Sequence, residues 1–501
     1  MAALSRGATV GVVGAGTMGG GIAEVAARAG HRVLLVDAVA GAADAAVAAT
    51  RERLNRSVAK GRLTKDEADA AAGRVTAVGS VADLMPCALV IEAVVEDLDT
   101  KRALFSELEG TCDSTAILAT NTSSLDVTEI AAGMAKPGRV AGMHFFNPAP
   151  VLPLVEIVAA ARTESAILGT LLETARAWGK TPVRCASTPG FIVNRVARPF
   201  YGEAFRLVEA GVADPATIDA LLREAGGFPM GPFELTDLIG QDVNAAVNRS
   251  IWEAFDHDPR FAPSPIQAAL VSEGRLGRKS GYGIYEGEQR PEPTTAPPAP
   301  RPLRLVVNGA GDPLEPLVAR LTRAGTQGIR TMDFGPVRLR PEPGVVLRLT
   351  DGRSAADLSE AAGETVVAVD LALDCATATR LAIAPPANAP ARAVSAAVGC
   401  LQAAGLSVTI LPDAPGLVVA RTVAMLAAFG ADAVDAGVAD AVDVDTAMRL
   451  GVNYPRGPIE WGDAVGWGWV QRVLAALAAT DDERRYRSFD SVRRRAVRPG
   501  G

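Results

Sequence analysis

Among the residues able to do chemistry, His144 has the most suggestive surroundings. The 501-residue chain contains three histidines. His31 precedes a predicted strand and His257 lies in a polar Asp-His-Asp-Pro loop, so neither points to catalysis. His144 ends a predicted strand at its carboxyl side, the edge at which parallel sheets place ligands. Because histidine ordinarily titrates near pH 6.5, this residue type can take a proton from an alcohol at neutral pH.

A carboxylate follows His144 after a turn. Asn147-Pro148 turns the chain, and a second extended run carries Glu156. If the two runs pair, Glu156 could hold the histidine in one tautomer, as a general base requires. From the residues alone, a structural histidine satisfied by hydrogen bonds is an equally good interpretation.

A glycine-rich turn near the start predicts a dinucleotide site. The strand Thr9–Val13 runs directly into Gly14-Ala-Gly16-Thr-Met-Gly19 and a helical stretch. Gly14 permits the tight turn, Gly16 lets the backbone approach a pyrophosphate, and Gly19 lets helix and strand pack closely. The diphosphate would lie at the helix N-terminus, where free N–H groups and the dipole favour an anion. The residues assigned to this turn are Gly14, Gly16, Thr17, Met18 and Gly19.

Asp37 indicates which dinucleotide binds. It ends the second predicted strand, where a carboxylate accepts hydrogen bonds from the adenosine ribose and repels a 2′-phosphate. We therefore predict NAD rather than NADP. The alternative is a glycine-rich turn in another kind of α/β protein.

The elements that must position these residues alternate between strands and helices up to residue 188. Such alternation predicts crossover connections and a mostly parallel sheet. The predicted strands are Thr9–Val13, Arg32–Val36, Ala88–Ile91, Thr115–Ala119 and Arg139–His144. Residues 189–285 read as helices, and residues 286–302 (EGEQRPEPTTAPPAPRP) are too rich in proline for either element.

The helical part is duplicated. PGFIVNR at 189–195 recurs as PGLVVAR at 415–421, a shift of 226 positions, and the same shift relates AGVAD at 210–214 to AGVAD at 436–440. Between the copies, short runs such as Leu303–Val307, Thr365–Val369 and Val408–Leu411 look like a cut-down copy of the first α/β region.

We therefore predict an α/β Rossmann-type NAD-binding domain, an all-α domain, a truncated α/β segment and a second copy of the all-α domain. The boundaries are 1–188 for the NAD-binding domain, 189–285 for the helical substrate and dimerisation domain, 286–302 for a Pro-rich linker, 303–413 for the degenerate α/β segment and 414–501 for the duplicated helical domain.

Composition excludes several classes of function. A formal net charge of -7 gives no basic surface for nucleic acid, and no apolar run reaches the length needed to span a bilayer. Five scattered cysteines form neither a CxxC pair nor a disulfide-like density, so we expect reduced thiols, a cytoplasmic location and no metal site.

Several motifs resemble the 3-hydroxyacyl-CoA dehydrogenase family over nearly all of residues 8–285. They are NTSS (121–124), HFFNPAPV (144–151), PGFIVNR (189–195), FPMGPFELTDLIG (228–240) and GRLGRKSGYGIY (274–285). HFFNP together with PGFIVNR is highly specific. NRVARPFYGEA (194–204), TDLIGQDVN (236–244) and RLGVNYPRGP (449–458) resemble the longer branch of the family, which acts on 3-hydroxyadipyl-CoA in phenylacetate breakdown.

The resemblance implies roles for the site residues. It makes His144 the base that deprotonates the C3 hydroxyl of an acyl-CoA while C3 gives hydride to NAD, and it makes Glu156 the orienting partner. Ser123 and Asn194 would hold the substrate oxygen and His144. Asn147 would shape the pocket. The family positions that line the NAD site are Glu96, Lys101 and Asn121. Similarity also implies the L (3S) isomer. A homo-oligomer, either a dimer or a trimer, is a further expectation.

Three basic residues could contact the rest of the substrate. Arg56 and Lys60 share one face of a predicted helix, a pattern that alone favours a solvated stripe. In the family, basic residues on this helix meet the CoA nucleotide. Arg198 lies four residues after Asn194, which we expect to start a helix, and could clamp the distal carboxylate of an adipyl chain. The alternative is a surface arginine that pairs with Glu203 or with solvent.

Other functions would use only part of this set of residues. A dehydrogenase of free 3-hydroxy acids would not need Arg56 and Lys60, and an NAD-binding structural protein would not need an intact His144. A bifunctional hydratase–dehydrogenase would need a further domain for which there is no room. The 303–501 half should carry no second active site, because it has no histidine, Ala420 stands where the shift places Asn194, and Leu314 stands where a third glycine would be.

Overall fold

The computed structural model describes residues 2–330, 335–481, 484–487 and 489–497. Contacts between residues divide the chain into two compact units. Unit 1 comprises Met1–Arg195 and Ala436–Val452, and unit 2 comprises Val196–Asp435 and Asn453–Gly501. These units differ from the predicted domain order, because a short segment of the second helical copy belongs to the unit that contains the first α/β region.

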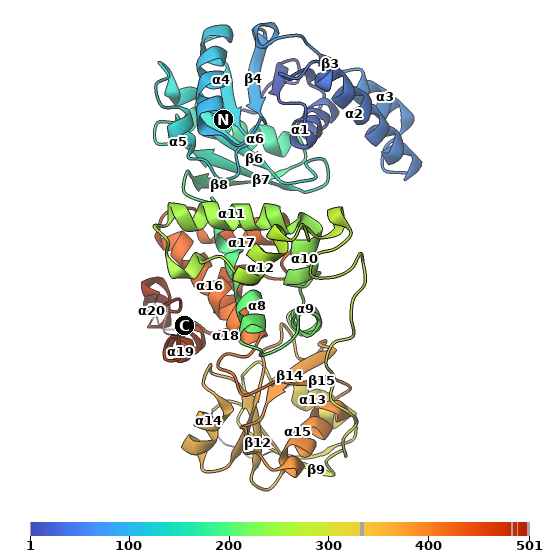
Figure 1. The fold of residues 1–501 in the computed structure, drawn as a ribbon, viewed down its shortest axis with the longest axis vertical. Coiled ribbons are helices and arrows are strands. Elements are labelled where there is room, and N and C mark those ends of the chain that lie inside the picture. Colours follow the sequence, from blue (N-terminus) through green and yellow to red (C-terminus); the bar gives the residue numbers. More distant parts are fainter. Residues whose placement is uncertain (1, 331–334, 482–483, 488, 498–501) are drawn as a thin grey trace. The chain divides into compact units, whose positions relative to one another are not determined.

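An eight-stranded sheet forms the centre of unit 1 (Figure 1). Neighbouring strands are parallel throughout, except that β6 and β7 are antiparallel. In spatial order the strands are β3 (Val75–Ala77), β2 (Arg32–Val36), β1 (Thr9–Val13), β4 (Cys87–Glu92), β5 (Ile117–Thr120), β6 (Val140–Phe145), β7 (Leu154–Ala159) and β8 (Thr181–Ala186). The mostly parallel sheet predicted from the sequence is confirmed, and β1 and β2 have the predicted bounds.

Helices cover both faces of this sheet, and His144 points to one of these faces. Alternate residues of the strands, among them Met143 and Phe145, join α1 and α6 in one buried core. Because side chains alternate along a strand, His144 points to the opposite face. The helices of this part of unit 1 are α1 (Thr17–Arg28), α2 (Ala42–Ala59), α3 (Lys65–Ala72), α4 (Leu98–Thr111), α5 (Val127–Ile130) and α6 (Ser165–Ala177).

The helices that follow repeat with the shift found in the sequence. Helices α10 and α18 each begin with a Gly-Pro pair, and in both the N-cap glycine N–H donates to the glutamate three positions on. The first copy comprises α7 (Val193–Val196), α8 (Arg198–Glu209), α9 (Pro215–Glu224), α10 (Pro232–Ile239), α11 (Gln241–Ala254) and α12 (Pro265–Ser272). The second comprises α16 (Val419–Asp435), α17 (Ala441–Gly451), α18 (Pro458–Val465), α19 (Trp467–Ala478) and α20 (Asp490–Ala496).

Unit 2 contains a second, seven-stranded sheet, so the truncated α/β segment is confirmed. In spatial order its strands are β10 (Gln327–Arg330), β9 (Arg304–Asn308), β11 (Arg338–Glu342), β12 (Val345–Leu349), β13 (Thr365–Val369), β14 (Arg380–Ala384) and β15 (Ser407–Ile410). Its helices are α13 (Glu315–Arg323), α14 (Ala355–Ala362) and α15 (Ala391–Ala403). The pairing β12–β13–β14–β15 is parallel, antiparallel, parallel, as in β5–β6–β7–β8.

The proline-rich segment 286–302 contains neither helix nor strand. It is nevertheless held in place, because Ala296 N–H donates to the Val408 carbonyl at 2.7 Å and Ala299 N–H donates to Gln402 Oε1 at 2.8 Å. The segment therefore lies along β15 and α15.

All five cysteines are free and buried. Within the described ranges, no helix is long and apolar enough to cross a membrane. No group of three or more His, Cys, Asp or Glu side chains in those ranges is arranged to hold a metal ion.

Candidate active site

His144 and Glu156 form a buried pair on β6 and β7. The antiparallel register places the two residues directly opposite each other, and His144 Nδ1 lies 2.7 Å from Glu156 Oε2. His144 is 6% exposed and Glu156 is 0% exposed. Since a carboxylate only accepts hydrogen bonds, Nδ1 carries the proton and Nε2 is the nitrogen able to act as a base.

The other oxygen of Glu156 is fixed by the backbone. Oε1 accepts hydrogen bonds from the N–H groups of Ile192 and Val193, each at 3.0 Å. These residues belong to the PGFIVNR motif, whose turn requires Phe191 at a φ of 46°. The motif therefore orients the carboxylate that orients the histidine.

The glycine turn has the shape that a dinucleotide requires. Gly14 has a φ of 100°, and a Cβ there would lie 2.4 Å from the Ala93 carbonyl oxygen. A Cβ on Gly19 would lie 1.7 Å from the Gly14 carbonyl oxygen, so only glycine allows this approach of helix to strand. Around Gly16, the N-cap of α1, a Cβ would meet no described atom within 4 Å. Thr17 and Met18 form the first turn of α1, and together these features fit a pyrophosphate at the helix N-terminus.

Asp37 braces the same turn. Its Oδ2 accepts a hydrogen bond from Ala15 N–H at 2.6 Å and its Oδ1 accepts one from Val39 N–H at 2.8 Å. A carboxylate with four acceptor positions retains capacity for the ribose hydroxyls of NAD.

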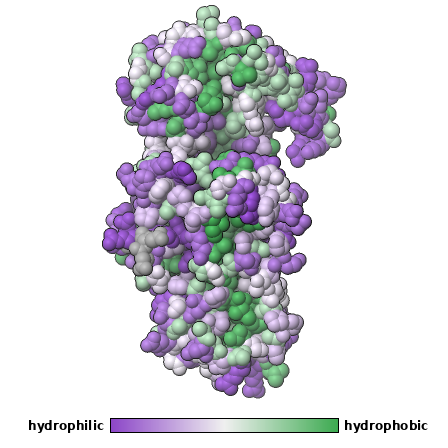
Figure 2. Space-filling view, in the orientation of Figure 1, coloured by the Kyte–Doolittle hydropathy of each residue, from purple (hydrophilic) through white to green (hydrophobic). Residues whose placement is uncertain are grey.

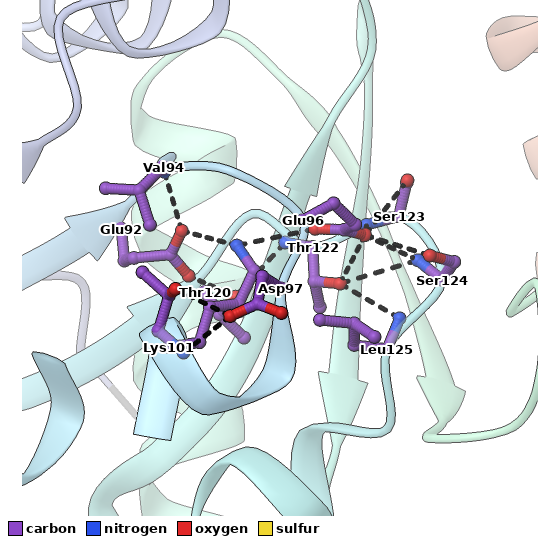
Figure 3. A network of polar contacts seen from close by, with 11 residues as sticks. Glu92, Val94, Glu96, Asp97, Lys101, Thr120, Thr122, Ser123, Ser124 and Leu125 are labelled. Atoms are coloured by element: carbon purple, nitrogen blue, oxygen red, sulfur yellow. Dashed lines mark hydrogen bonds and ion pairs between the residues drawn. The ribbon is translucent and has the colours of Figure 1, made fainter. Parts of the chain in front are cut away.

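A second carboxylate, Glu96, gathers the NTSS loop (Figure 3). Its Oε1 accepts hydrogen bonds from Thr122 Oγ1 at 2.7 Å and from the N–H groups of Ser123 and Ser124 at 2.9 and 3.1 Å. Burial disfavours its charge, but Lys101 and these donors together hold the pKa of Glu96 below its ordinary value. The Ser123 hydroxyl also donates to Glu96, at 3.2 Å. The hydroxyl expected to hold the substrate oxygen is therefore engaged by Glu96 in this structure.

Lys101 and Asn121 contact Glu96 and the strand that carries His144, respectively. Lys101 is 1% exposed, and its Nζ lies 2.5 Å from Glu92 Oε1 and 3.4 Å from Glu96 Oε2. Asn121 Oδ1 accepts a hydrogen bond from Phe145 N–H at 2.8 Å, which ties the end of β5 to β6 beside His144.

Asn194 and Asn147 complete the residues near the pair. Asn194 Nδ2 donates to the Ser123 carbonyl at 3.4 Å, so the PGFIVNR motif contacts the NTSS loop. Asn147 is exposed in the loop that follows β6. Lys180, which sequence reasoning missed, holds this loop by donating to the carbonyls of Ala149 and Leu152 at 2.5 and 2.8 Å. Burial lowers the pKa of Lys180 to about 8, and no sequence motif marked this residue.

The basic pair Arg56 and Lys60 lies at the C-terminal end of α2, which packs against α3. Both residues are exposed, and Arg56 forms a 3.8 Å ion pair with Glu52. Figure 2 shows a largely hydrophilic surface on this helical hairpin. The side chains are therefore accessible to an anionic ligand.

Arg198 lies outside the continuous helix and the exposed surface that were expected for it. The helix expected from Asn194 onward is interrupted, because α7 ends at Val196 and α8 begins at Arg198. The surface alternative is wrong, since Arg198 is 6% exposed and its guanidinium lies 5.0 Å from the centre of the Tyr201 ring. Burial lowers the pKa of Arg198, and Tyr454 also faces it.

The second copy has lost the chemical groups of the first. The 226-residue shift relates His144 to Asp370 and Glu156 to Ala382. His144 and Glu156 face each other across the antiparallel strands β6 and β7. In the second copy β13 and β14 are also antiparallel, and Asp370 N–H donates to the Ala382 carbonyl at 3.0 Å. Asp370 takes over the backbone contacts of Glu156, accepting N–H bonds from Val418 and Val419 at 3.0 and 2.8 Å. Burial raises the pKa of Asp370 to about 6. A lone carboxylate remains where the first copy has a base and its partner.

The glycine turn of the second copy carries an acidic side chain, Asp312. Asp312 Oδ1 accepts a hydrogen bond from the N–H of Leu314, the N-cap of α13, at 2.8 Å. Its Oδ2 accepts one from Val337 N–H at 2.7 Å. An acidic side chain in this position disfavours a dinucleotide.

Models of known domain families match most of the chain. The model described as "3-hydroxyacyl-CoA dehydrogenase, NAD binding domain" matches residues 9–188. The one described as "3-hydroxyacyl-CoA dehydrogenase, C-terminal domain" matches residues 190–287 and again 416–498. Residues 347–415 match "3-hydroxybutyryl-CoA dehydrogenase reduced Rossmann-fold domain".

Curated relatives and solved structures agree with these matches. The chain is 43% identical over 493 residues to the 3-hydroxyadipyl-CoA dehydrogenase of Escherichia coli K12, covering 98% of each chain. It is 43% identical over 289 residues to a 3-hydroxybutyryl-CoA dehydrogenase of Mycobacterium tuberculosis, covering 55% of this chain and 97% of that one. A crystal structure of 3-hydroxybutyryl-CoA dehydrogenase from Escherichia coli K12 superposes with a TM-score of 0.90 at 42% identity, covering 99% of each chain.

Proposed function

This chain belongs to the 3-hydroxyacyl-CoA dehydrogenase family and oxidises 3-hydroxyacyl-CoA thioesters with NAD, and we propose that His144 is the general base of this reaction. The observation that carries the proposal is the buried pair of His144 and Glu156, in which the carboxylate contacts Nδ1 at 2.7 Å. A structural histidine has no need of a second, fully buried charged group, whereas a base that must become an imidazolium does.

NAD fits the turn at Gly14, Gly16 and Gly19, where the first N–H groups of α1 and the Asp37 carboxylate would hold it. When bound, NAD supplies the acceptor for the hydride that leaves C3. Glu96 would lie at the edge of that site and keep the NTSS loop in one conformation.

The remaining steps belong to the side chains of the site. His144 Nε2 takes the proton of the C3 hydroxyl, and Glu156 stabilises the imidazolium that forms. Asn194 and Ser123, joined by a hydrogen bond, flank the substrate oxygen, and the Ser123 hydroxyl turns from Glu96 to donate to that oxygen. Asn147 borders the acyl chain, and the L (3S) isomer presents its hydroxyl to the base.

We further propose that the acyl group carries a distal carboxylate that Arg198 recognises. Arg198 is four residues from Asn194, so their Cα atoms are at most about 15 Å apart. Burial lowers the pKa of Arg198, and a desolvated cation gains more from an anionic ligand than an exposed one does. The full-length Escherichia coli relative is a 3-hydroxyadipyl-CoA dehydrogenase, whereas the superposed structure carries the name of the butyryl enzyme.

Steady-state NADH formation separates these possibilities. The proposal predicts turnover of 3-hydroxyacyl-CoA esters but not of the free 3-hydroxy acids, whose turnover would contradict an acyl-CoA site. Arg198→Leu should lower kcat/KM for 3-hydroxyadipyl-CoA by roughly 10- to 150-fold while leaving 3-hydroxybutyryl-CoA nearly unchanged. Arg198→Lys, which keeps the charge, should lose less. Equal losses on both substrates would remove Arg198 from carboxylate recognition.

A further inference from the structure

Helix α17 belongs to the second helical copy but packs in unit 1. The segment just before the helix lies at the free edge of β8, where Ala186 N–H donates to the Val438 carbonyl at 2.8 Å. Arg184 N–H donates to Asp443 Oδ2 at 2.9 Å. A helix more than 250 positions away in sequence is thus attached to the sheet that carries the catalytic pair.

The C-terminal residue of α17, Gly451, lies against three side chains around that pair. A Cβ on Gly451 would lie 2.7 Å from Leu154 Cδ2, 3.1 Å from Val193 Cγ2 and 3.8 Å from Phe146 Cε1. The first two distances are shorter than ordinary van der Waals contact, so any larger residue would displace these side chains.

Each of these three residues lies close to His144 or Glu156 in the sequence or in the structure. Val193 N–H donates to Glu156 Oε1, and Leu154 precedes Glu156 by two positions on the same face of β7. The Phe146 ring centre lies 4.5 Å from that of His144. Gly451 therefore borders residues that adjoin both members of the pair.

The equivalent helix of the first copy, α9, packs on the other sheet. In unit 2, Leu373 N–H donates to the Ala225 carbonyl at 2.9 Å, and Arg380 Nε lies 3.1 Å from Glu224 Oε2. The 226-residue shift relates Ala225 to Gly451. The two copies have thus exchanged equivalent helices, as two chains do when they swap an element across a two-fold interface.

We propose that α17 completes the His144 site and that Gly451 is a positioning residue for the reaction. The second copy lacks the histidine and glutamate pair of the first and contributes instead Gly451 of α17, which packs against Phe146, Leu154 and Val193. This inference rests on the proposed role of His144, and it assigns the duplicated half a part in catalysis.

Gly451→Ala and Gly451→Val in the full-length chain test the proposal. Pushing the side chains around the pair by about 1 Å should lower kcat by about tenfold for alanine and by about 10²-fold for valine. The acid limb of the kcat/KM profile should shift, because the Glu156–His144 contact is disturbed, while NAD affinity measured by calorimetry should not change. Adding Leu154→Val, which removes the atom closest to the new Cβ, should restore part of the activity of Gly451→Ala.

Ala225→Val is the matched control, since it crowds the equivalent position of α9 against the second sheet. It should lower the melting temperature as much as Gly451→Val does and leave kcat and its pH profile unchanged. Equal losses of kcat in both variants, or a Gly451→Val enzyme with unaltered kcat and pH profile, would overturn the positioning role. The proposed function fails separately, if His144→Gln retains activity.

Discussion

Replacing Glu156 by glutamine tests the catalytic pair with almost no change of shape. The two backbone N–H groups of Ile192 and Val193 both point at Oε1. In the variant they should hold the amide oxygen on their side, because the opposite orientation would set an NH2 group against two donors and lose two buried hydrogen bonds. That loss costs about 2–6 kcal/mol. The amide NH2 must therefore face His144 Nδ1.

This orientation reverses the polarity of the contact. His144 Nδ1 must accept a hydrogen bond, which moves the imidazole proton to Nε2 and removes the free base. The variant also loses the attraction between carboxylate and imidazolium. At an effective dielectric of about 20 and a charge separation of about 4 Å, that attraction is about 4 kcal/mol, or about 10³-fold in rate. We expect kcat to fall by about 10³-fold.

The assay is NADH formation from a 3-hydroxyacyl-CoA, with NAD binding measured separately by calorimetry. NAD affinity should be unchanged, because the glycine turn and Asp37 are on other strands. Asp370→Ala, which removes the corresponding carboxylate of the second copy, should retain kcat in the fraction that folds. A Glu156→Gln enzyme within tenfold of the wild-type kcat would refute the tautomer argument.

Three further outcomes follow from the same geometry. Calorimetry should find one NAD site per chain, because the Asp312 carboxylate in the second glycine turn accepts N–H bonds from Leu314 and Val337 and would repel a phosphate. Two sites would contradict this. Burial lowers the pKa of Lys180 to about 8, so as the pH rises the folded state loses this proton before the unfolded state does. The free energy of unfolding of the wild-type protein should therefore rise between about pH 8 and pH 10.5 relative to Lys180→Met, by at most about 3 kcal/mol. Urea midpoints that change in parallel for the two proteins would show that the amine is not desolvated. Replacing Arg56 and Lys60 together by alanine should raise KM for the acyl-CoA by about three- to tenfold at low ionic strength, with less effect at high salt; a salt-independent KM would argue against a nucleotide contact.

The pairing of His144 with Glu156 was accessible from sequence because its signal is local. A histidine at the end of one extended run and a glutamate in the next, separated by an Asn-Pro turn, fix the register once the strands pair, since opposite residues in antiparallel strands must meet. The glycine turn is similar, because each glycine has a steric reason that holds wherever a strand enters a helix.

Other parts of the site depend on contacts that sequence spacing does not encode. Glu96 binds the NTSS loop across 26 to 28 residues of sequence, and Lys101 is buried between two carboxylates that no motif brings together. The buried guanidinium of Arg198 interacts with Tyr454, which belongs to the second copy. The duplication could be read from the constant shift, but not the exchange of α9 and α17, because equivalent helices fit either sheet equally well by pattern.

The most direct test of the account is NADH formation by His144→Gln, measured at 340 nm with a 3-hydroxyacyl-CoA and saturating NAD. Glutamine can still meet Glu156, so the fold and the NAD site should persist, and NAD affinity should match that of the wild-type protein. If His144 is the base, kcat should fall by about 10²–10⁴-fold. Activity within a few-fold of wild type would show that His144 is not the base and that the buried pair serves the fold alone.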